Sequence, residues 1–168
     1  MIWSHAVGPR GTVTGLEYSQ EYADLAQQAW KEGGFDNIGV HVGDAFFSSL
    51  PKLADVSEPY DIIFIDADKT GYPGYLRQIL AMSAPGAARR LLRAGGIIAT
   101  DNALRQGLVA DDSADNPNRH AGYSDANSFD HKAVAAVREY NKAAAENARL
   151  ETFMCPLWDG LSLARLVD

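Results

Sequence analysis

The segment that decides the fold is YDIIFIDADK, Tyr60–Lys69. Apart from Asp61, its first six residues are β-branched or aromatic, which is typical of a short strand buried on both faces. A second run of this kind, GGIIATDN at Gly95–Asn102, follows about thirty residues later and also ends in polar residues. We expect the two runs to be neighbouring central strands of a parallel sheet, because strands buried on both faces are characteristic of α/β folds.

Polar side chains follow both predicted strands at the point where each strand ends. Ligands of open α/β sheets bind beyond the carboxyl ends of the strands, so Asp66, Asp68, Lys69, Asp101 and Asn102 are expected at one edge, called here the carboxyl edge. Carboxylate and amide oxygens favour hard divalent cations such as Mg²⁺, Mn²⁺ or Ca²⁺. In a simpler interpretation the aspartates cap helices and Lys69 pairs with Asp68 in solvent.

Lys69 follows Asp66 by three residues and is expected at the same edge. A second positive charge close to a bound cation is unfavourable, so a lysine there loses its proton more readily and can act as a base.

Composition narrows the class of protein. The 168 residues fit one domain, 1–168, and the net charge of −7 is spread along the chain, which argues against nucleic acid or a membrane surface as a partner. Cys155 is the only cysteine, so no internal disulfide can form. No secretory leader and no apolar run of transmembrane length is present in the sequence, and the expected location is cytoplasmic.

The rest of the chain alternates between predicted strands and helices, as a βαβ fold requires. The expected strands are Thr12–Glu17, Asn37–Val42, Leu150–Leu157 and Leu161–Val167, and the expected helices are Ser19–Glu32, Ser48–Pro59, Tyr72–Met82 and a helix from Ser128 or Asp130 to Asn147. The first helix carries an apolar stripe at Tyr22, Leu25, Ala26, Ala29 and Trp30.

Three connections have their own signals. Asp159-Gly160 between two apolar runs predicts a hairpin, which would place an antiparallel pair at the sheet edge. The segment 83–90 is longer than expected for the connection between the helix Tyr72–Met82 and the next predicted strand. We expect it on the surface, away from the carboxyl edge. The segment 103–129 is polar and rich in Asp, Asn and Gly, which suits either a loop over the pocket or a solvated connection.

Several motifs together resemble the cation-dependent O-methyltransferase family, which includes the caffeoyl-CoA and catechol O-methyltransferases. These are FIDADK at 64–69 with Tyr72 and Tyr75, GGIIATDN at 95–102 with Gly107, and PLWDGL at 156–161. The resemblance implies a Rossmann-like, doubly wound sheet of the class I methyltransferase type, mostly parallel with a C-terminal antiparallel hairpin.

The resemblance also implies a role for individual residues. Asp66, Asp101 and Asn102 would bind the cation, Lys69 would be the catalytic base, Glu17 would bind the ribose of S-adenosyl-L-methionine, Asp44 and Ala45 its adenine, Asp68 its methionine end, and Asp66 and Gln106 the substrate. Without the resemblance, Glu17 would be interpreted as a carboxylate favoured by a helix dipole and Asp44 as a helix cap.

The implied activity is methyl transfer from S-adenosyl-L-methionine to a hydroxyl of a catechol-like or phenylpropanoid substrate, with Mg²⁺ as the first choice of cation. The alternative is a truncated, catalytically impaired protein of the same fold that acts through oligomerisation. A nicotinamide-dependent dehydrogenase is disfavoured because no Gly-x-Gly-x-x-Gly follows any predicted strand.

The glycine-rich loop and the first central strand of that family have no counterpart before Gly8, so the chain is expected to be N-terminally truncated relative to it. The absent strand would lie between the strands at 12–17 and 60–66, leaving backbone groups without partners. Direct pairing of those two strands, insertion of a segment from another copy, or dimerisation through the exposed edges would each resolve this. We therefore expect a homodimer, with strand exchange as one form of it.

Overall fold

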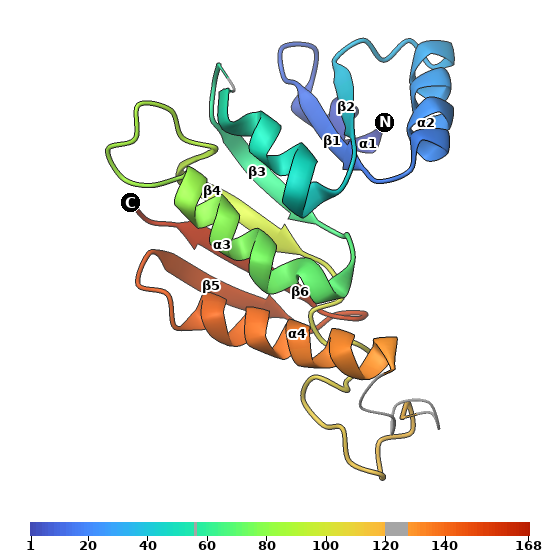
Figure 1. The fold of residues 1–168 in the computed structure, drawn as a ribbon, viewed down its shortest axis with the longest axis vertical. Helices are drawn as coiled ribbons and strands as arrows, with labels where there is room; N and C mark the ends of the chain where they lie inside the picture. Colours follow the sequence, from blue (N-terminus) through green and yellow to red (C-terminus); the bar gives the residue numbers. More distant parts are fainter. Residues whose placement is uncertain (56, 120–127) are drawn as a thin grey trace. The chain divides into compact units, whose positions relative to one another are not determined.

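The structure, a computed structural model, describes residues 1–55, 57–119 and 128–168 (Figure 1). The chain forms two compact units, Met1–Asp55 and Val56–Asp168. Each unit is built around its own sheet. Among the described residues, no helix is both long enough and apolar enough to cross a bilayer.

The first unit contains two parallel strands joined through a helix. Its elements are α1 (Ile2–Val7), β1 (Val13–Glu17), α2 (Gln20–Glu32), β2 (Ile38–Val42), a π-helical turn η1 (Ala45–Ser49) and a 3-10 helix η2 (Leu50–Asp55). Glu17 lies opposite Val42 in the β1–β2 pair. The predicted start of α2 is confirmed, because the Ser19 hydroxyl accepts a hydrogen bond from the Tyr22 amide at 3.3 Å.

The apolar stripe of α2 is largely exposed, since Tyr22 is 64% exposed and Leu25 is 56% exposed, whereas Ala23, outside the stripe, is fully buried. The expected α-helix at 48–59 is replaced by η1 and η2. The helical segment starts earlier than predicted, at Ala45 after the Asp44 cap, which puts Pro51 beyond the first turn, where it lacks the amide hydrogen that an α-helix requires.

The second unit is a four-stranded sheet in the order β3-β4-β6-β5 (Figure 1). Its elements are β3 (Tyr60–Ile65), the 3-10 turn η3 (Lys69–Gly71), α3 (Tyr72–Met82), β4 (Leu92–Thr100), α4 (Phe129–Ala145), β5 (Leu150–Cys155) and β6 (Leu161–Leu166). Strands β3 and β4 are parallel, whereas β6 is antiparallel to both β4 and β5. The predicted central pair and C-terminal hairpin are therefore confirmed.

Helices α3 and α4 lie on the same face of this sheet (Figure 1). Their apolar stripes, which recur at helical spacing, form the core against the inward residues of the strands. The most deeply buried of these side chains are Leu76, Ile79, Val134, Val137, Tyr140, Ile98 and Leu166. The opposite face of the sheet is more open, with Ile62, Phe64 and Phe153 between 42% and 64% exposed.

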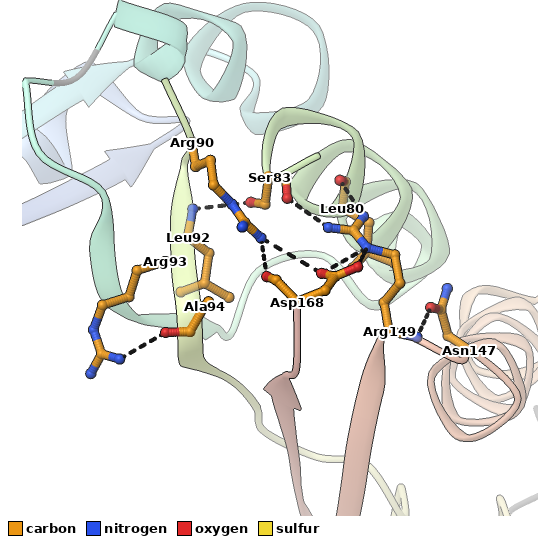
Figure 2. Close-up of polar contacts among 9 residues, drawn as sticks. All are labelled: Leu80, Ser83, Arg90, Leu92, Arg93, Ala94, Asn147, Arg149 and Asp168. Atoms are coloured by element: carbon orange, nitrogen blue, oxygen red, sulfur yellow. Dashed lines mark hydrogen bonds and ion pairs between the residues drawn. The ribbon is translucent and has the colours of Figure 1, made fainter. Parts of the chain in front are cut away.

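The end of the sheet opposite the carboxyl edge is fastened by Arg149, which follows α4 (Figure 2). Its guanidinium donates to the backbone oxygens of Leu80 at 2.9 Å and Ser83 at 2.6 Å, and it contacts the Asp168 carboxylate at 2.7 Å. Arg90 donates to the backbone oxygen of Asp168. The segment 83–90 lies at this end and is mostly exposed, as predicted.

Strands β1 and β3 were expected to flank the position of the absent strand. Among the described strands, β1 is hydrogen-bonded only to β2 and β3 only to β4. The three alternatives for the position of the absent strand stay predictions. The connection predicted at 103–129 is only partly described, because residues 120–127 lie outside the described ranges.

Candidate active site

Lys69 begins the 3-10 turn that joins β3 to α3, and its side chain is only 11% exposed. Its Nζ lies 2.8 Å from Asp66 Oδ1 and donates to the Tyr72 hydroxyl at 2.7 Å. Lys69 therefore pairs with Asp66 rather than with Asp68 in solvent, which was the simpler interpretation of the sequence.

Tyr72 is fully buried at the first position of α3. Its hydroxyl donates to the backbone oxygen of Asp101 at 3.1 Å and accepts from Lys69. Burial, and then the negative charges of Asp66 and Asp101, raise the pKa of Tyr72 well above its ordinary value. Tyr72 is thus a neutral phenol that links the end of β3, the start of α3 and the end of β4.

The predicted ligands Asp66 and Asp101 follow adjacent strands and reach the same edge. Ile65 lies opposite Thr100 in the β3–β4 pair, and the Asp101 amide donates to the Ile65 oxygen at 3.0 Å. The Tyr72 hydroxyl donates to the Asp101 backbone oxygen and accepts from Lys69 Nζ, which also contacts Asp66 Oδ1. The sequence prediction of a shared carboxyl edge is therefore confirmed for this pair.

Asn102 follows Asp101 in a left-handed conformation with φ 55°. Its backbone amide donates to Asp101 Oδ1 at 2.7 Å, and its side-chain Nδ2 donates to Asp159 Oδ2 at 3.0 Å. Asp159 lies in the β5–β6 turn and also accepts a hydrogen bond from the backbone amide of Gln106. Gln106, the predicted substrate contact, is exposed and also left-handed, with φ 56°.

The three predicted metal ligands carry oxygen atoms of the kind that a hard cation prefers. Asp66 and Asp101 each use Oδ1 in a protein contact and retain Oδ2, while Asn102 donates through Nδ2 and retains its amide oxygen. Oxygen ligands of this type are those that Mg²⁺ and Ca²⁺ prefer. Within the described parts of the chain, no group of three or more His, Cys, Asp or Glu side chains is arranged to hold a metal. The predicted set contains two such side chains, its third member being an amide.

Asp68 is exposed and is held by two hydroxyl donors. Tyr75 donates to its Oδ1, and Thr70 donates to its Oδ2 at 3.0 Å. Gly71 permits this arrangement, because a Cβ at that position would lie 2.7 Å from the Tyr75 ring. The Asp68 carboxylate was predicted to face the methionine end of the donor. The side chains of Thr70 and Tyr75 fix its orientation.

The predicted ribose and adenine residues gather at the carboxyl ends of β1 and β2, within the first unit. The Glu17 carboxylate accepts the Ser19 amide through Oε1 at 2.8 Å and retains Oε2, while the Gly43 amide donates to the Glu17 backbone oxygen at 2.9 Å. Asp44 caps η1 by accepting the Phe47 amide at 2.8 Å, and Ala45 is the first residue of that turn. The structural roles anticipated for Glu17 and Asp44 are therefore present, and each is compatible with ligand binding.

Sequence reasoning gave no role to Tyr72 or Asp159, although both belong to the motifs that carry the resemblance. Tyr72 was identifiable only as a helix-start residue, and Asp159 only as half of an Asp-Gly turn signal. The partners of Asp159 are the Asn102 side chain and the Gln106 backbone amide, 57 and 53 positions away, and only tertiary structure brings them together. Tyr72 contacts Lys69 three positions away, within one turn of chain.

Comparison with known proteins identifies the family. The O-methyltransferase family model matches residues 1–167. A probable caffeoyl-CoA O-methyltransferase 1 of Dictyostelium discoideum is 33% identical over 167 residues, which cover 97% of the chain and 62% of the relative. The catechol O-methyltransferase of Mycobacterium tuberculosis is 35% identical over 116 residues, covering 68% of the chain and 47% of the relative.

A solved structure shows the same fold. The crystal structure of SAH-bound methyltransferase PaMTH1 from Podospora anserina matches with a TM-score of 0.75 at 26% identity, over 94% of this chain and 61% of that one. The chain spans about six tenths of the length of the first curated relatives that it matches. The α/β fold with an antiparallel C-terminal pair is that of the class I methyltransferases, and the chain belongs to the O-methyltransferase family.

Proposed function

We propose that this protein transfers a methyl group from S-adenosyl-L-methionine to one hydroxyl of a catechol-like or phenylpropanoid substrate, with the help of a divalent cation. The observation that carries the proposal is the confinement of Lys69 between Asp66 and Tyr72 at the carboxyl edge of the sheet. The named activities of the caffeoyl-CoA and catechol relatives support the substrate class.

The donor, when bound, supplies the methyl group on a sulfonium, and the cation, when bound, supplies a positive charge that favours an ionised substrate hydroxyl. Lys69 receives the proton of the reacting hydroxyl at Nζ. Asp66, 2.8 Å away, then stabilises the resulting ammonium. The neutral Tyr72 hydroxyl accepts a hydrogen bond from Nζ and so restricts where that atom can lie.

We expect most of the rate enhancement to come from holding the substrate hydroxyl in line with the methyl group of the donor. Asp66, Asp101 and Asn102 would hold the cation and, through it, the substrate oxygens. Glu17, Asp44, Ala45 and Asp68 would hold the donor, whose sulfonium makes a carboxylate such as Asp68 a favourable neighbour. The family resemblance also suggests the exposed Gln106 as a substrate contact.

The test is calorimetric titration of S-adenosyl-L-methionine into the 168-residue chain, with Mg²⁺ present and after its removal. The proposal predicts saturable binding with a Kd on the order of micromolar. Glu17→Gln should weaken this binding, and Glu32→Gln, a change at the far end of α2, should leave it unchanged. Failure to bind at millimolar ligand would contradict the donor half of the proposal.

A further inference from the structure

A hollow of about 280 Å³ lies in the second unit, at the end of the sheet opposite the carboxyl edge. Three arginines line it, Arg89, Arg90 and Arg93, and its other described lining residues are serine, proline and alanine. None of the described lining residues is acidic, although the whole chain has a net charge of −7. We call this feature the arginine hollow.

Two buried leucines hold the backbone between the second and third arginines. Leu91 is 2% exposed and Leu92 is fully buried. The Leu91 amide donates to the Met82 oxygen at 2.9 Å, and its own oxygen accepts from the Tyr60 amide at 2.7 Å. The Leu92 amide donates to Ser83 Oγ at 3.0 Å (Figure 2). The fold therefore fixes where the arginine side chains leave the backbone.

The start of β4 forms a bulge beside the hollow. In the β3–β4 pair, the four residues 93–96 stand opposite Asp61 alone. Bulges redirect side chains and are common next to functional sites. Here Arg93 Nε lies 2.6 Å from Asp61 Oδ1, and Arg93 Nη1 donates to the Ala94 oxygen at 3.0 Å (Figure 2). The bulge thus holds the Arg93 guanidinium at the lining of the hollow, with Nη2 retained as a donor.

Arg90 shares its carboxylate partner with a second arginine. Asp168 lies 2.7 Å from Arg149 Nε and 3.6 Å from Arg90 Nη2, so two positive charges meet one negative charge (Figure 2). The Arg90 side chain is only 20% exposed, and its buried Nε donates to none of the described groups. Buried donors normally have an acceptor. An anion in the hollow would therefore face a mostly buried positive charge that the shared carboxylate does not balance.

We propose that the arginine hollow binds a phosphate group, either as free phosphate or as part of a small organic molecule. Guanidinium groups bind phosphate oxygens through paired N–H donors, and a phosphate monoester carries more negative charge than a carboxylate. The alanine and proline lining would contact an organic portion of the ligand. The hollow lies at the other end of the sheet from Lys69, so the inference does not rest on the proposed methyl transfer.

The experiment is titration of inorganic phosphate, and separately of phenyl phosphate, into the ¹⁵N-labelled 168-residue chain. Binding is followed by ¹H–¹⁵N NMR, with the ionic strength held constant by NaCl. We expect saturable shifts of the backbone amides of residues 87–94, with a Kd for inorganic phosphate on the order of millimolar. Tighter binding of phenyl phosphate identifies a phosphorylated organic ligand, and equal or weaker binding identifies free phosphate; both results support the site.

Four variants locate the binding. Arg89→Gln and Arg93→Gln each remove one guanidinium from an exposed part of the lining, where loss of an ion pair has little effect on stability. We expect each to weaken phosphate binding by about tenfold. Ala88→Asp, which adds a carboxylate to the lining, should weaken it as well. Arg77→Gln is the matched control, because it removes an arginine from an exposed pair with Glu139 outside the hollow.

The inference is supported if phosphate binding saturates and either arginine variant of the hollow weakens it, while Arg77→Gln does not. Shifts that grow without saturation, or an affinity that neither variant of the hollow changes, would show screening of surface charge only and overturn the inference. An equal loss in Arg77→Gln would overturn it too. The dispersion of the amide spectrum checks that each variant is folded.

Discussion

The amine of Lys69 lies 2.7 Å from the hydroxyl of Tyr72. That hydroxyl in turn donates to the backbone oxygen of Asp101. One buried phenol thereby connects the proposed base to the end of the neighbouring strand, 29 residues away from Tyr72 in sequence. The position of the base thus depends on the docking of α3 onto the β3–β4 pair.

Tyr72→Phe should destabilise the fold at neutral pH. The change removes the hydrogen bond that the Asp101 oxygen accepts and one of the two contacts of the Lys69 amine, which keeps Asp66, at a cost of about 1–3 kcal/mol in the free energy of unfolding. Urea denaturation measures this difference. Tyr75→Phe, which removes the hydroxyl bound to the exposed carboxylate of Asp68, should cost less.

The stability difference between wild type and Tyr72→Phe should also depend on pH. The pKa of Tyr72 is raised in the folded protein, so its stabilising contribution is complete below the unfolded value of about 10 and is lost as the pH rises above it. The stability gap between wild type and Tyr72→Phe should narrow above about pH 10. A gap that stays constant from pH 7 to 11 would show that Tyr72 ionises normally.

Asp168→Asn should lower the stability of the protein near neutral pH, and this difference from wild type should disappear in acid. The hydrogen bond from Arg149, and the charges of Arg149 and Arg90, hold the pKa of Asp168 below its usual value (Figure 2). The contribution is present above the unfolded pKa of about 3.9 and disappears as the pH falls through the lower, folded value. The difference in Tm between wild type and variant should be constant from about pH 5 to 7 and shrink below about pH 4. Asp36→Asn is the control.

Gly160→Ala should destabilise the protein by about 1–3 kcal/mol, because a left-handed backbone is combined with a Cβ that would lie 2.9 Å from the Leu104 amide nitrogen. Gly39→Ala is the control, since a Cβ there meets nothing within 4 Å. Equal stability of the two variants in thermal unfolding would contradict the close approach of the β5–β6 turn to Leu104.

We propose that the chain forms a homodimer through the strands that would flank the absent strand. Ile62 and Phe64 of β3 are 48% and 42% exposed, and a second copy that pairs with β3 would cover them. Light scattering should give twice the 18.2 kDa mass of one chain, and Phe64→Lys should shift the mass toward the monomer. Tyr22→Lys, at an exposed aromatic residue of α2, should not. A monomeric wild type would refute the proposal.

Much of the second unit could be predicted from the sequence because its signals are local. Two apolar runs ending in carboxylates gave β3 and β4, and helical spacing gave the buried stripes of α3 and α4. The position of Asp66 and Asp101 at the same edge followed from the rule that the carboxyl ends of neighbouring parallel strands lie together.

Other features depend on tertiary contacts that local patterns do not contain. The hydrogen bond between Asn102 and Asp159 joins residues 57 positions apart. The stripe of α2 has the period of a buried face, yet Tyr22 and Leu25 are mostly exposed, because periodicity identifies an apolar face without identifying what covers it. The helix predicted at 48–59 starts instead at Ala45, and this earlier start puts Pro51 beyond the first turn, where proline is unfavourable in an α-helix.

Methyl transfer is the measurement that tests the central claim most directly. The wild-type chain is incubated with S-adenosyl-L-methionine labelled in its methyl group and with a catechol, with Mg²⁺ or with a chelator, and labelled product is counted. We predict product that requires Mg²⁺ and falls by about 10²- to 10⁴-fold in Lys69→Met, while Lys132→Met, a change at an exposed lysine of α4, retains activity. Labelled product formed equally by wild type and Lys69→Met, or no product from a wild-type chain that binds the donor, would contradict the account.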